Sequence, residues 1–167
     1  SINGNFVNLS RNTVTYSHLG LYLRSGGNLT LTSNNLSNNY QNAHANIAVF
    51  PLSTLDGSNT VDGKTLYYNG SCQTNLVVNS ASNIGVLWLA NCNKNITVGN
   101  MSLDYESQPL LFFNHSGSVT IDNVTLNNSA AGILSDPSLE GEVIFYSSNP
   151  SSPSSFNVKN SGLGNSI

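Results

Sequence analysis

The stretch that decides the fold is residues 87–103, LWLANCNKNITVGNMSL, read together with residues 110–126, LLFFNHSGSVTIDNVTL. At an offset of 23 residues four positions keep their character: Leu87 aligns with Leu110, Ile96 with Val119, Asn100 with Asn123, and Leu103 with Leu126. A fixed offset of this length is the signature of a repeat architecture.

Similar offsets extend the repeat in both directions. The matches are Asn5 with Asn28, Asn12 with Asn35, residues 65–69 with residues 87–91 (offset 22), Leu110 with Ile133, and residues 156–160 with residues 119–123 (offset 37). The longer last offset indicates a loop insertion that includes the Ser- and Pro-rich residues 147–155. The repeat therefore spans the chain.

Each repeat consists of short alternating segments, such as Asn95-Ile96-Thr97-Val98, bounded by Asn, Gly and Ser. Period-two alternation between such residues is typical of strands and turns, and no segment has a helical period with caps. A unit of about 23 residues cannot bury its own apolar side and must stack on its neighbours. We therefore expect an all-β fold, a right-handed parallel β-helix of about six rungs. It should form one domain over residues 1–167, with irregular insertions at residues 51–74 and 136–155.

Asparagines at equivalent turns should form ladders along the axis of the stack. We expect Asn100, Asn123 and Asn160 to stack at a spacing of about 4.8 Å, their amides bonding from rung to rung. The pairs Asn5 with Asn28 and Asn12 with Asn35 should do the same.

Two cysteines allow one disulfide. Residues 75–78 match residues 95–98 at an offset of 20, and this offset also places Cys72 on Cys92. Neighbours on adjacent rungs lie about 4.8 Å apart, which is within the Cα separation that a disulfide accepts. We predict that a Cys72–Cys92 bond pins the irregular segment to the solenoid. The alternative is two buried thiols.

Charge is scarce in this chain. Only 8% of the residues are charged, against about 25% in an average soluble domain, and the net charge is −3. Nucleic-acid binding needs a basic footprint that five scattered cations do not supply, and no apolar run is long enough for a membrane span. The chain also contains 28 Asn, many of them in N-x-Ser/Thr sequons.

These sequons predict an extracellular or cell-surface glycoprotein, because covalent N-glycans would provide the solvation that charged side chains usually give. Attachment is expected on turns and insertions: first at Asn69 and Asn114, then at Asn8, Asn28, Asn95 and Asn127. Asn100 and Asn123 should remain bare, because their amides are needed for the ladder. The composition alone also explains most of the sequons.

Residues 59–68, NTVDGKTLYY, followed by residues 86–98, VLWLANCNKNITV, resemble the NosD-like right-handed β-helix proteins. In that family a similar "NTVNGKPLYY" segment precedes an "LVNCSNVTVENL" rung. The resemblance covers roughly residues 1–135, implies the right-handed β-helix and export, and suggests an archaeal surface protein. The name-giving members are linked to copper delivery, but His18, His44, His115 and Met101 are too scattered for a copper site.

Other β-helix proteins act on polysaccharides through paired carboxylates. Candidate acids are Asp104, Glu106, Asp122, Asp136, Glu140 and Glu142, but the repeat does not stack Asp104 on Asp122. Tyr67, Tyr68 and Trp88 could instead form a sugar-binding face, with Leu66 expected on Trp88 and Tyr67 on Leu89. A stacked core is the stronger reading of Trp88. A carbohydrate-binding or polysaccharide-degrading protein remains the alternative function.

We expect a non-enzymatic structural protein without metal or cofactor that associates with itself head to tail. Neither end of the chain reads as a cap, and residues 166–167 joined to residues 1–3 imitate residues 118–122. The junction would complete a rung, so that copies propagate into a surface layer or filament. The copies could be separate subunits or consecutive repeats of one chain, and the alternative is a fragment cut from a longer solenoid.

Overall fold

The computed structural model describes residues 2–45, 54–104, 110–113, 117–127, 133–134, 143–146, 156–159 and 162–163. The described residues are mostly strand, with one short 3-10 helix, which confirms the all-β prediction. The strands are stacked in parallel as a β-solenoid of about four turns rather than the six expected. Fewer turns result because several turns are longer than 23 residues: Leu110, for example, pairs with Val143.

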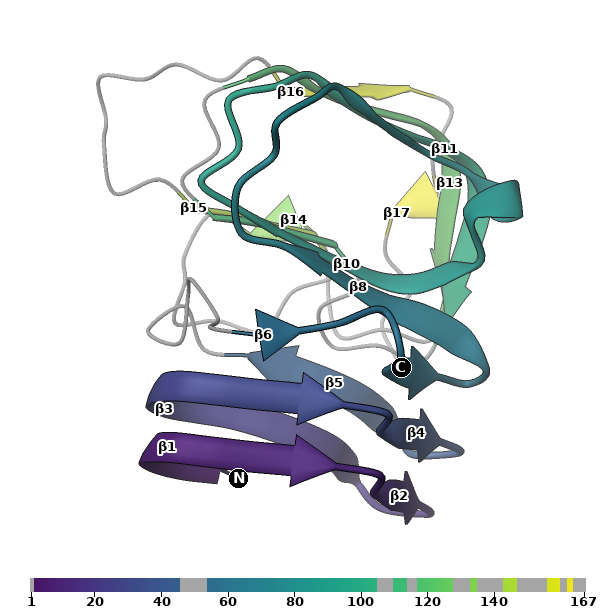
Figure 1. Ribbon diagram of the computed structural model, residues 1–167. Helices are drawn as coiled ribbons and strands as arrows, with labels where there is room; N and C mark the ends of the chain where they lie inside the picture. Colours follow the sequence, from purple (N-terminus) through teal and green to yellow (C-terminus); the bar gives the residue numbers. More distant parts are fainter. Residues whose placement is uncertain are drawn as a thin grey trace.

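The first part of the chain forms three rungs from alternating long and short strands (Figure 1). A four-stranded sheet contains β1 (Ile2–Ser10), β3 (Leu19–Thr32), β5 (Gln41–Ala45) and β6 (Thr54–Leu55). The second strands of these rungs are β2 (Thr13–Thr15), β4 (Asn35–Ser37) and β7 (Thr60–Val61). These pairs are parallel, as a solenoid requires.

The second part continues one of these sheets and adds another. The eight-stranded sheet runs through β2, β4 and β7 to β8 (Lys64–Asn69), β10 (Ile84–Ala90), β12 (Leu110–Phe113), β15 (Val143–Tyr146) and β14 (Ile133–Leu134). A five-stranded sheet contains β9 (Leu76–Val78), β11 (Ile96–Asp104), β13 (Val119–Asn127), β16 (Phe156–Lys159) and β17 (Gly162–Leu163). The short 3-10 helix η2 (Ser80–Ser82) connects β9 to β10.

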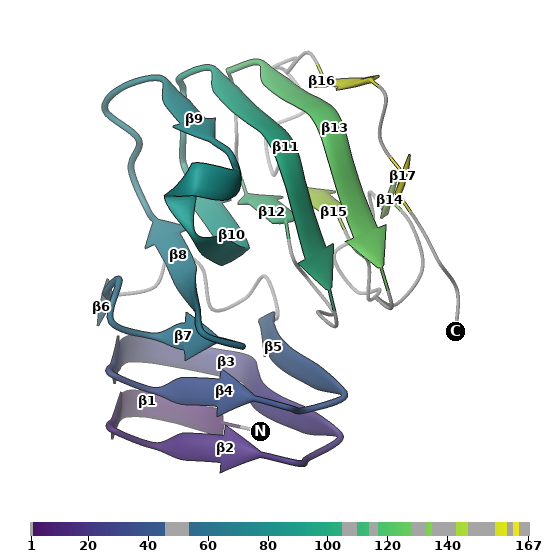
Figure 2. The same cartoon turned by 90° about the vertical axis from the view of Figure 1, so that its right-hand side faces the viewer.

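A hairpin joins the two parts. β7 and β8 pair antiparallel around Asp62 and Gly63, whose φ angles are 47° and 76°. Asp-Gly with two positive φ angles is the preferred chemistry of a tight hairpin turn. Figure 2 shows the consequence: β9, β11 and β13 lie side by side in a direction that runs across the stacking direction of β1–β4. The solenoid therefore bends at this hairpin.

The 23-residue register is confirmed in the second part, where Ile96 pairs with Val119 and Leu87 with Leu110. The pairing of residues 156–159 with residues 119–122 is also confirmed, and residues 143–146 form a strand within the expected insertion. Asn160 lies outside the described residues. The predicted stacking of Leu110 on Ile133 is wrong, because β15 lies between β12 and β14.

The register of the first part was predicted one residue out. Asn28 pairs with Phe6 rather than with Asn5, and Asn35 pairs with Thr13 rather than with Asn12. The true offset in these strands is 22, because a one-residue slip would turn every inward side chain outward. From Leu66 onward, strands β8 and β10 pair at an offset of 20, not 22.

Two hydrophobic cores lie on opposite sides of β10. Val86, Trp88 and Ala90 belong to the first core with Leu29 and Leu31, whereas Leu87 and Leu89 belong to the second with Ile96 and Val98. All seven residues of β10 are buried. The strand is thus a wall between the cores, since alternate side chains face opposite sides.

Candidate functional site

An asparagine ladder runs along the first corner of the three N-terminal rungs. Asn34 Oδ1 accepts hydrogen bonds from the backbone N–H of Asn12 at 3.1 Å and from its Nδ2 at 3.0 Å. Asn59 Oδ1 accepts the equivalent bonds from Asn34, at 3.2 Å and 2.8 Å. Each amide nitrogen also caps a strand end: Asn34 Nδ2 donates to Leu9 O and Asn59 Nδ2 to Leu31 O. The ladder has a direction, because every Oδ1 faces the preceding rung.

Some of the asparagines lie at corners with positive φ. Among the described residues, nine other than glycine have positive φ, and five of these are Asn. Asn tolerates the left-handed region better than most residues. Asn100 and Asn123 bend β11 and β13 in this way, and Asn123 Nδ2 donates to Asn100 Oδ1 at 2.9 Å. The predicted stacking of these two residues is confirmed.

The outer side of the first rung carries no further strand in the part of the chain that the structure describes. β1 and β2 are the terminal strands of their sheets, at the bottom of Figure 1. In the second rung Leu29 and Leu31 are 1% exposed and Leu36 is 3% exposed. Their first-rung partners are only half-buried. Those partners are Val7, Leu9 and Val14. We call these three residues and Asn12 the open rung.

Asn12 shows the same incompleteness in its hydrogen bonds. Its Nδ2 donates to Ser10 O and to Asn34 Oδ1, but its own Oδ1 accepts nothing from the described residues. Asn34 Oδ1 and Asn59 Oδ1 each accept two bonds. The open rung therefore offers the acceptor that a further rung would use, beside apolar side chains that a further rung would bury.

A ring pair marks the second corner. His18 stacks on Tyr40 with ring centroids 5.0 Å apart and planes 9° apart. Both side chains are exposed, and the rings belong to equivalent positions of the first two rungs, since Tyr40 N donates to Ser17 O. His44 does not join this pair: it is buried and contacts Tyr22. His115 lies outside the described residues.

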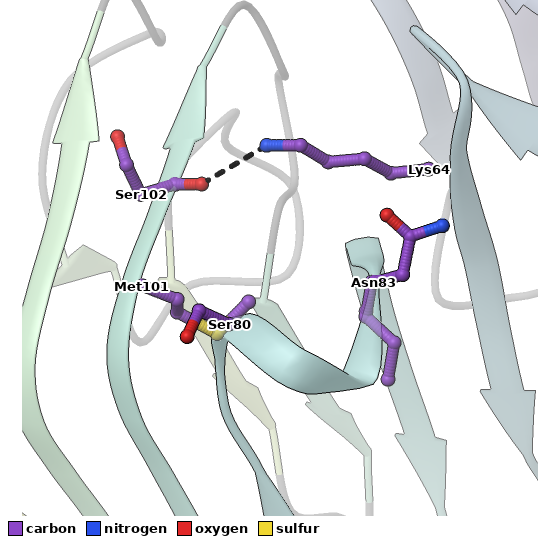
Figure 3. A pocket seen from close by; sticks show the side chains of 6 residues that line it. Lys64, Ser80, Asn83, Met101 and Ser102 are labelled. Atoms are coloured by element: carbon purple, nitrogen blue, oxygen red, sulfur yellow. Dashed lines mark hydrogen bonds between the residues drawn. The ribbon is translucent and has the colours of Figure 1, made fainter.

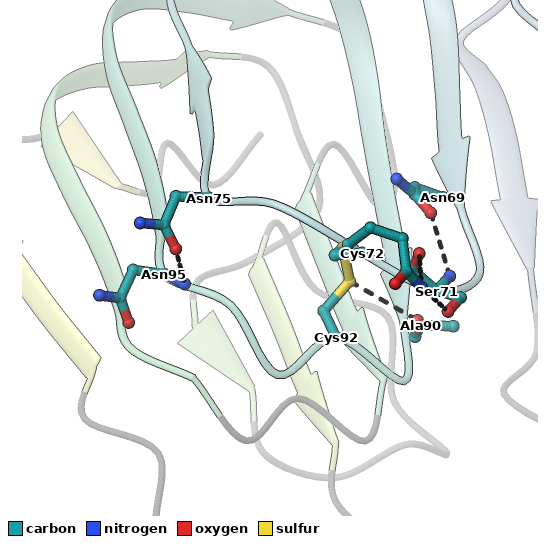
Figure 4. The surroundings of a disulfide bond; sticks show 8 residues. Asn69, Ser71, Cys72, Asn75, Ala90, Cys92 and Asn95 are labelled. Atoms are coloured by element: carbon teal, nitrogen blue, oxygen red, sulfur yellow. Dashed lines mark hydrogen bonds between the residues drawn. A yellow bond between two sulfur atoms is a disulfide. The ribbon is translucent and has the colours of Figure 1, made fainter.

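The predicted disulfide is confirmed, with Cys72 and Cys92 joined at a Cα separation of 4.7 Å (Figure 4). Beside it lies a further amide ladder that the sequence analysis missed. Asn75 Oδ1 accepts from Asn95 N at 3.0 Å, and Asn95 Oδ1 accepts from Ser118 N at 3.2 Å. The sequence carried a signal for this ladder, because Asn95 follows Asn75 by 20 residues and Ser118 follows Asn95 by 23, the offsets of the repeat.

The sequons are mostly on the outside of the solenoid. Exposed sequon asparagines are Asn8, Asn28, Asn35, Asn95, Asn100 and Asn123. Asn69 is half-buried at the end of β8, where its Oδ1 accepts from Ser71 N at 3.0 Å. Asn127 is the last residue of β13, and Asn114 lies outside the described residues. Glycosylation at these positions stays a prediction.

The two candidate carboxylates on described strands, Asp104 and Asp122, do not converge. Asp104 pairs with Asn127, and Asp122 pairs with Gly99 and Lys159, which confirms that the register does not stack the two acids. Glu106, Asp136, Glu140 and Glu142 lie outside the described residues. Within the described residues no cluster of three or more His, Cys, Asp or Glu could hold a metal ion.

A cavity of about 270 Å³ lies where the hairpin meets η2 and β11 (Figure 3). Its lining consists of Lys64, Ser80, Asn83, Ile84, Met101 and Ser102. Lys64 Nζ donates to the backbone oxygen of Ser102 at 3.3 Å. The lining contains no carboxylate, so this cavity does not supply the acid pair of a glycoside hydrolase.

The suggested aromatic sugar-binding face is absent from β8 and β10. Trp88 and Leu89 are fully buried, and Tyr67 and Tyr68 are half-buried against the two cores. The core reading of Trp88 is confirmed, but its expected partner is wrong: Trp88 stacks on Tyr68, while Tyr67 stacks on Leu87. Neither face of β10 is available to bind a sugar, because each face packs against one of the two cores.

No helix in the described part of the chain is long and apolar enough to cross a membrane. Comparisons with protein families, curated proteins and solved structures find no match to this chain. The candidate functional surface is therefore defined by its own geometry, the open rung of a bent β-solenoid.

Proposed function

We propose that this protein is a non-enzymatic structural β-solenoid whose copies associate through the open rung, head to tail, as building blocks of an extracellular layer or filament. The single observation that carries the proposal is the half-built layer of Val7, Leu9, Val14 and Asn12. Burying such apolar side chains stabilises a contact by about 25 cal/mol per Å².

The direction of the Asn ladder favours head-to-tail contact. Asn12 Oδ1 needs a donor, such as the backbone N–H and Nδ2 groups that Asn34 presents to Asn59. Two copies meeting through the same open rung would place one Oδ1 against another, and neither oxygen could donate. The contact is therefore heterologous, which generates either a ring or an open filament.

The bend at the hairpin affects the shape of such an assembly. Because the second part stacks across the first in Figure 2, an added copy would not continue the first axis in a straight line. The assembly should therefore be a helical or zigzag array. Such a geometry suits a layer as well as a fibre.

Glycans belong to the same proposal. With 8% charged residues, the surface has little ionic solvation, and exposed sequons on β1, β3 and β4 provide attachment points around the first rungs. Attached glycans would keep the outward faces hydrated and leave the open rung as the contact surface. The NosD-like resemblance and the disulfide agree with an exported, archaeal-type surface protein.

Sedimentation velocity at rising protein concentration tests the proposal. Wild-type protein should form a concentration-dependent series of oligomers. Val14→Lys should abolish the series, because it places a charge in the contact. The control is Val77→Lys, since Val77 is 64% exposed on β9 and lies away from the open rung. A wild-type chain that remains monomeric at high concentration would overturn the proposal.

A further inference from the structure

An exposed aromatic ring lies next to a sequon on β1. In the segment Phe6-Val7-Asn8-Leu9-Ser10, the side chains of Val7 and Leu9 pack against the first core. Successive side chains of a strand point to opposite faces, so Phe6 and Asn8 share the outward face. Phe6 is 81% exposed, and Asn8 is also exposed.

The amide of Asn8 is available for attachment. It makes no hydrogen bond to the described residues, whereas the amides of Asn100 and Asn123 bind each other. Asn8 pairs with Thr30 across the strands, and Phe6 pairs with Asn28. The ring thus lies beside Asn28, which is itself an exposed sequon asparagine.

We infer that Phe6 is a packing platform for the first sugar of an N-linked glycan on Asn8. The distance between side chains i and i+2 on a strand is about 6.7 Å, which the Asn side chain and its sugar linkage can span. The apolar C–H face of a pyranose ring can then lie on the aromatic face of Phe6. This inference rests on the glycosylation included in the proposed function.

Asn28 is a second sequon asparagine beside Phe6, because the two exposed residues pair across β1 and β3. Tyr67 also precedes a sequon by two residues, but it is half-buried against the second core. Tyr16 is 85% exposed, but its φ of 55° places it in a corner rather than on a strand. It therefore shares no strand face with a sequon. Phe6 is therefore the exposed ring beside Asn8, the glycan site at Asn28 has to be removed from the test, and Tyr16 is a matched control.

A double-mutant cycle on glycosylated protein tests this inference. The chain is secreted from a eukaryotic cell line that attaches glycans through N-acetylglucosamine, and mass spectrometry measures occupancy at Asn8. Unfolding by urea is then compared, with Asn28→Gln present throughout, for the parent chain, Phe6→Ser, Asn8→Gln and the double variant. The cycle isolates the coupling between ring and glycan.

With the glycan present, Phe6→Ser should lower the folding equilibrium constant about five-fold more than it does in the Asn8→Gln background. Tyr16→Ser should have the same effect in both backgrounds. If Asn8 is occupied and the Phe6→Ser effect does not depend on it, the platform is refuted while glycosylation stands. If Asn8 carries no glycan, both the platform and glycosylation at this site are refuted.

Discussion

Replacing Asn34 by alanine should destabilise the protein by about 3 to 4 kcal/mol. The side chain is 5% exposed and takes part in four hydrogen bonds, two as acceptor from Asn12 and two as donor, to Leu9 O and Asn59 Oδ1. Its removal leaves partly buried groups of all three neighbours without their partner, at about 1 kcal/mol for each lost bond. For a chain of this size the melting temperature should fall by roughly 10 °C.

Urea unfolding followed by the fluorescence of Trp88 provides the assay. Trp88 is the single tryptophan and is fully buried, so its emission reports exposure of the core. Asn12→Ala is the control, because its exposed side chain loses only two donated bonds and should cost less than about 1 kcal/mol. Equal losses in the two variants would refute the reasoning that a directional ladder supports the rungs.

Three further substitutions test other parts of the fold. Replacing Cys72 and Cys92 by serine opens a loop of 20 residues and should lower the unfolding free energy by about 3 kcal/mol, which chemical denaturation measures against the oxidised wild type. Gly117→Ala would place a Cβ against the backbone oxygen of Lys94 and should cost about 1–3 kcal/mol, whereas Gly57→Ala, with nothing within 4 Å, should be neutral or slightly stabilising; equal melting temperatures would contradict this contrast. Asn123→Ala should destabilise the corner at φ 54° by about 1 kcal/mol and Asn123→Gly by less, and thermal melts that rank them the other way would argue against a left-handed corner.

The solenoid itself could be predicted because strand alternation and a constant offset coincide in residues 87–126. Ile96 and Val119 are separated by a turn without insertion, so the offset 23 translates directly into strand pairing. The same reasoning placed Cys72 on Cys92 at an offset of 20. Sequence patterns are enough to predict strand pairing where consecutive rungs have the same length.

The N-terminal register could not be resolved from composition. Asn34 and Asn35 are adjacent, and both match Asn12 in type, but only Asn34 is buried and bonded in the ladder. Which of two neighbouring amides points inward depends on the alternation of Leu31 and Leu36 around the corner. Packing of the leucines in the core therefore determines which asparagine joins the ladder, and residue type alone does not.

The bend and the double burial of β10 were not predicted, although signals for both were present. Asp62-Gly63 is a strong hairpin signal. Whether such a hairpin projects from a straight solenoid or changes its stacking direction depends on the strands that follow. The run from Ile84 to Ala90 is almost continuously apolar, which is typical of a strand buried on both faces. Treating one of its faces as free led to the incorrect sugar-binding surface.

Electron microscopy of the purified 167-residue chain at high concentration tests the central claim most directly. The open rung predicts linear or ring-shaped assemblies in which the spacing of about 4.8 Å between rungs continues across the boundary between copies. Val14→Lys should dissolve these assemblies into single particles, and Val77→Lys should not. Single, well-separated particles of the wild-type chain at every concentration would contradict the account.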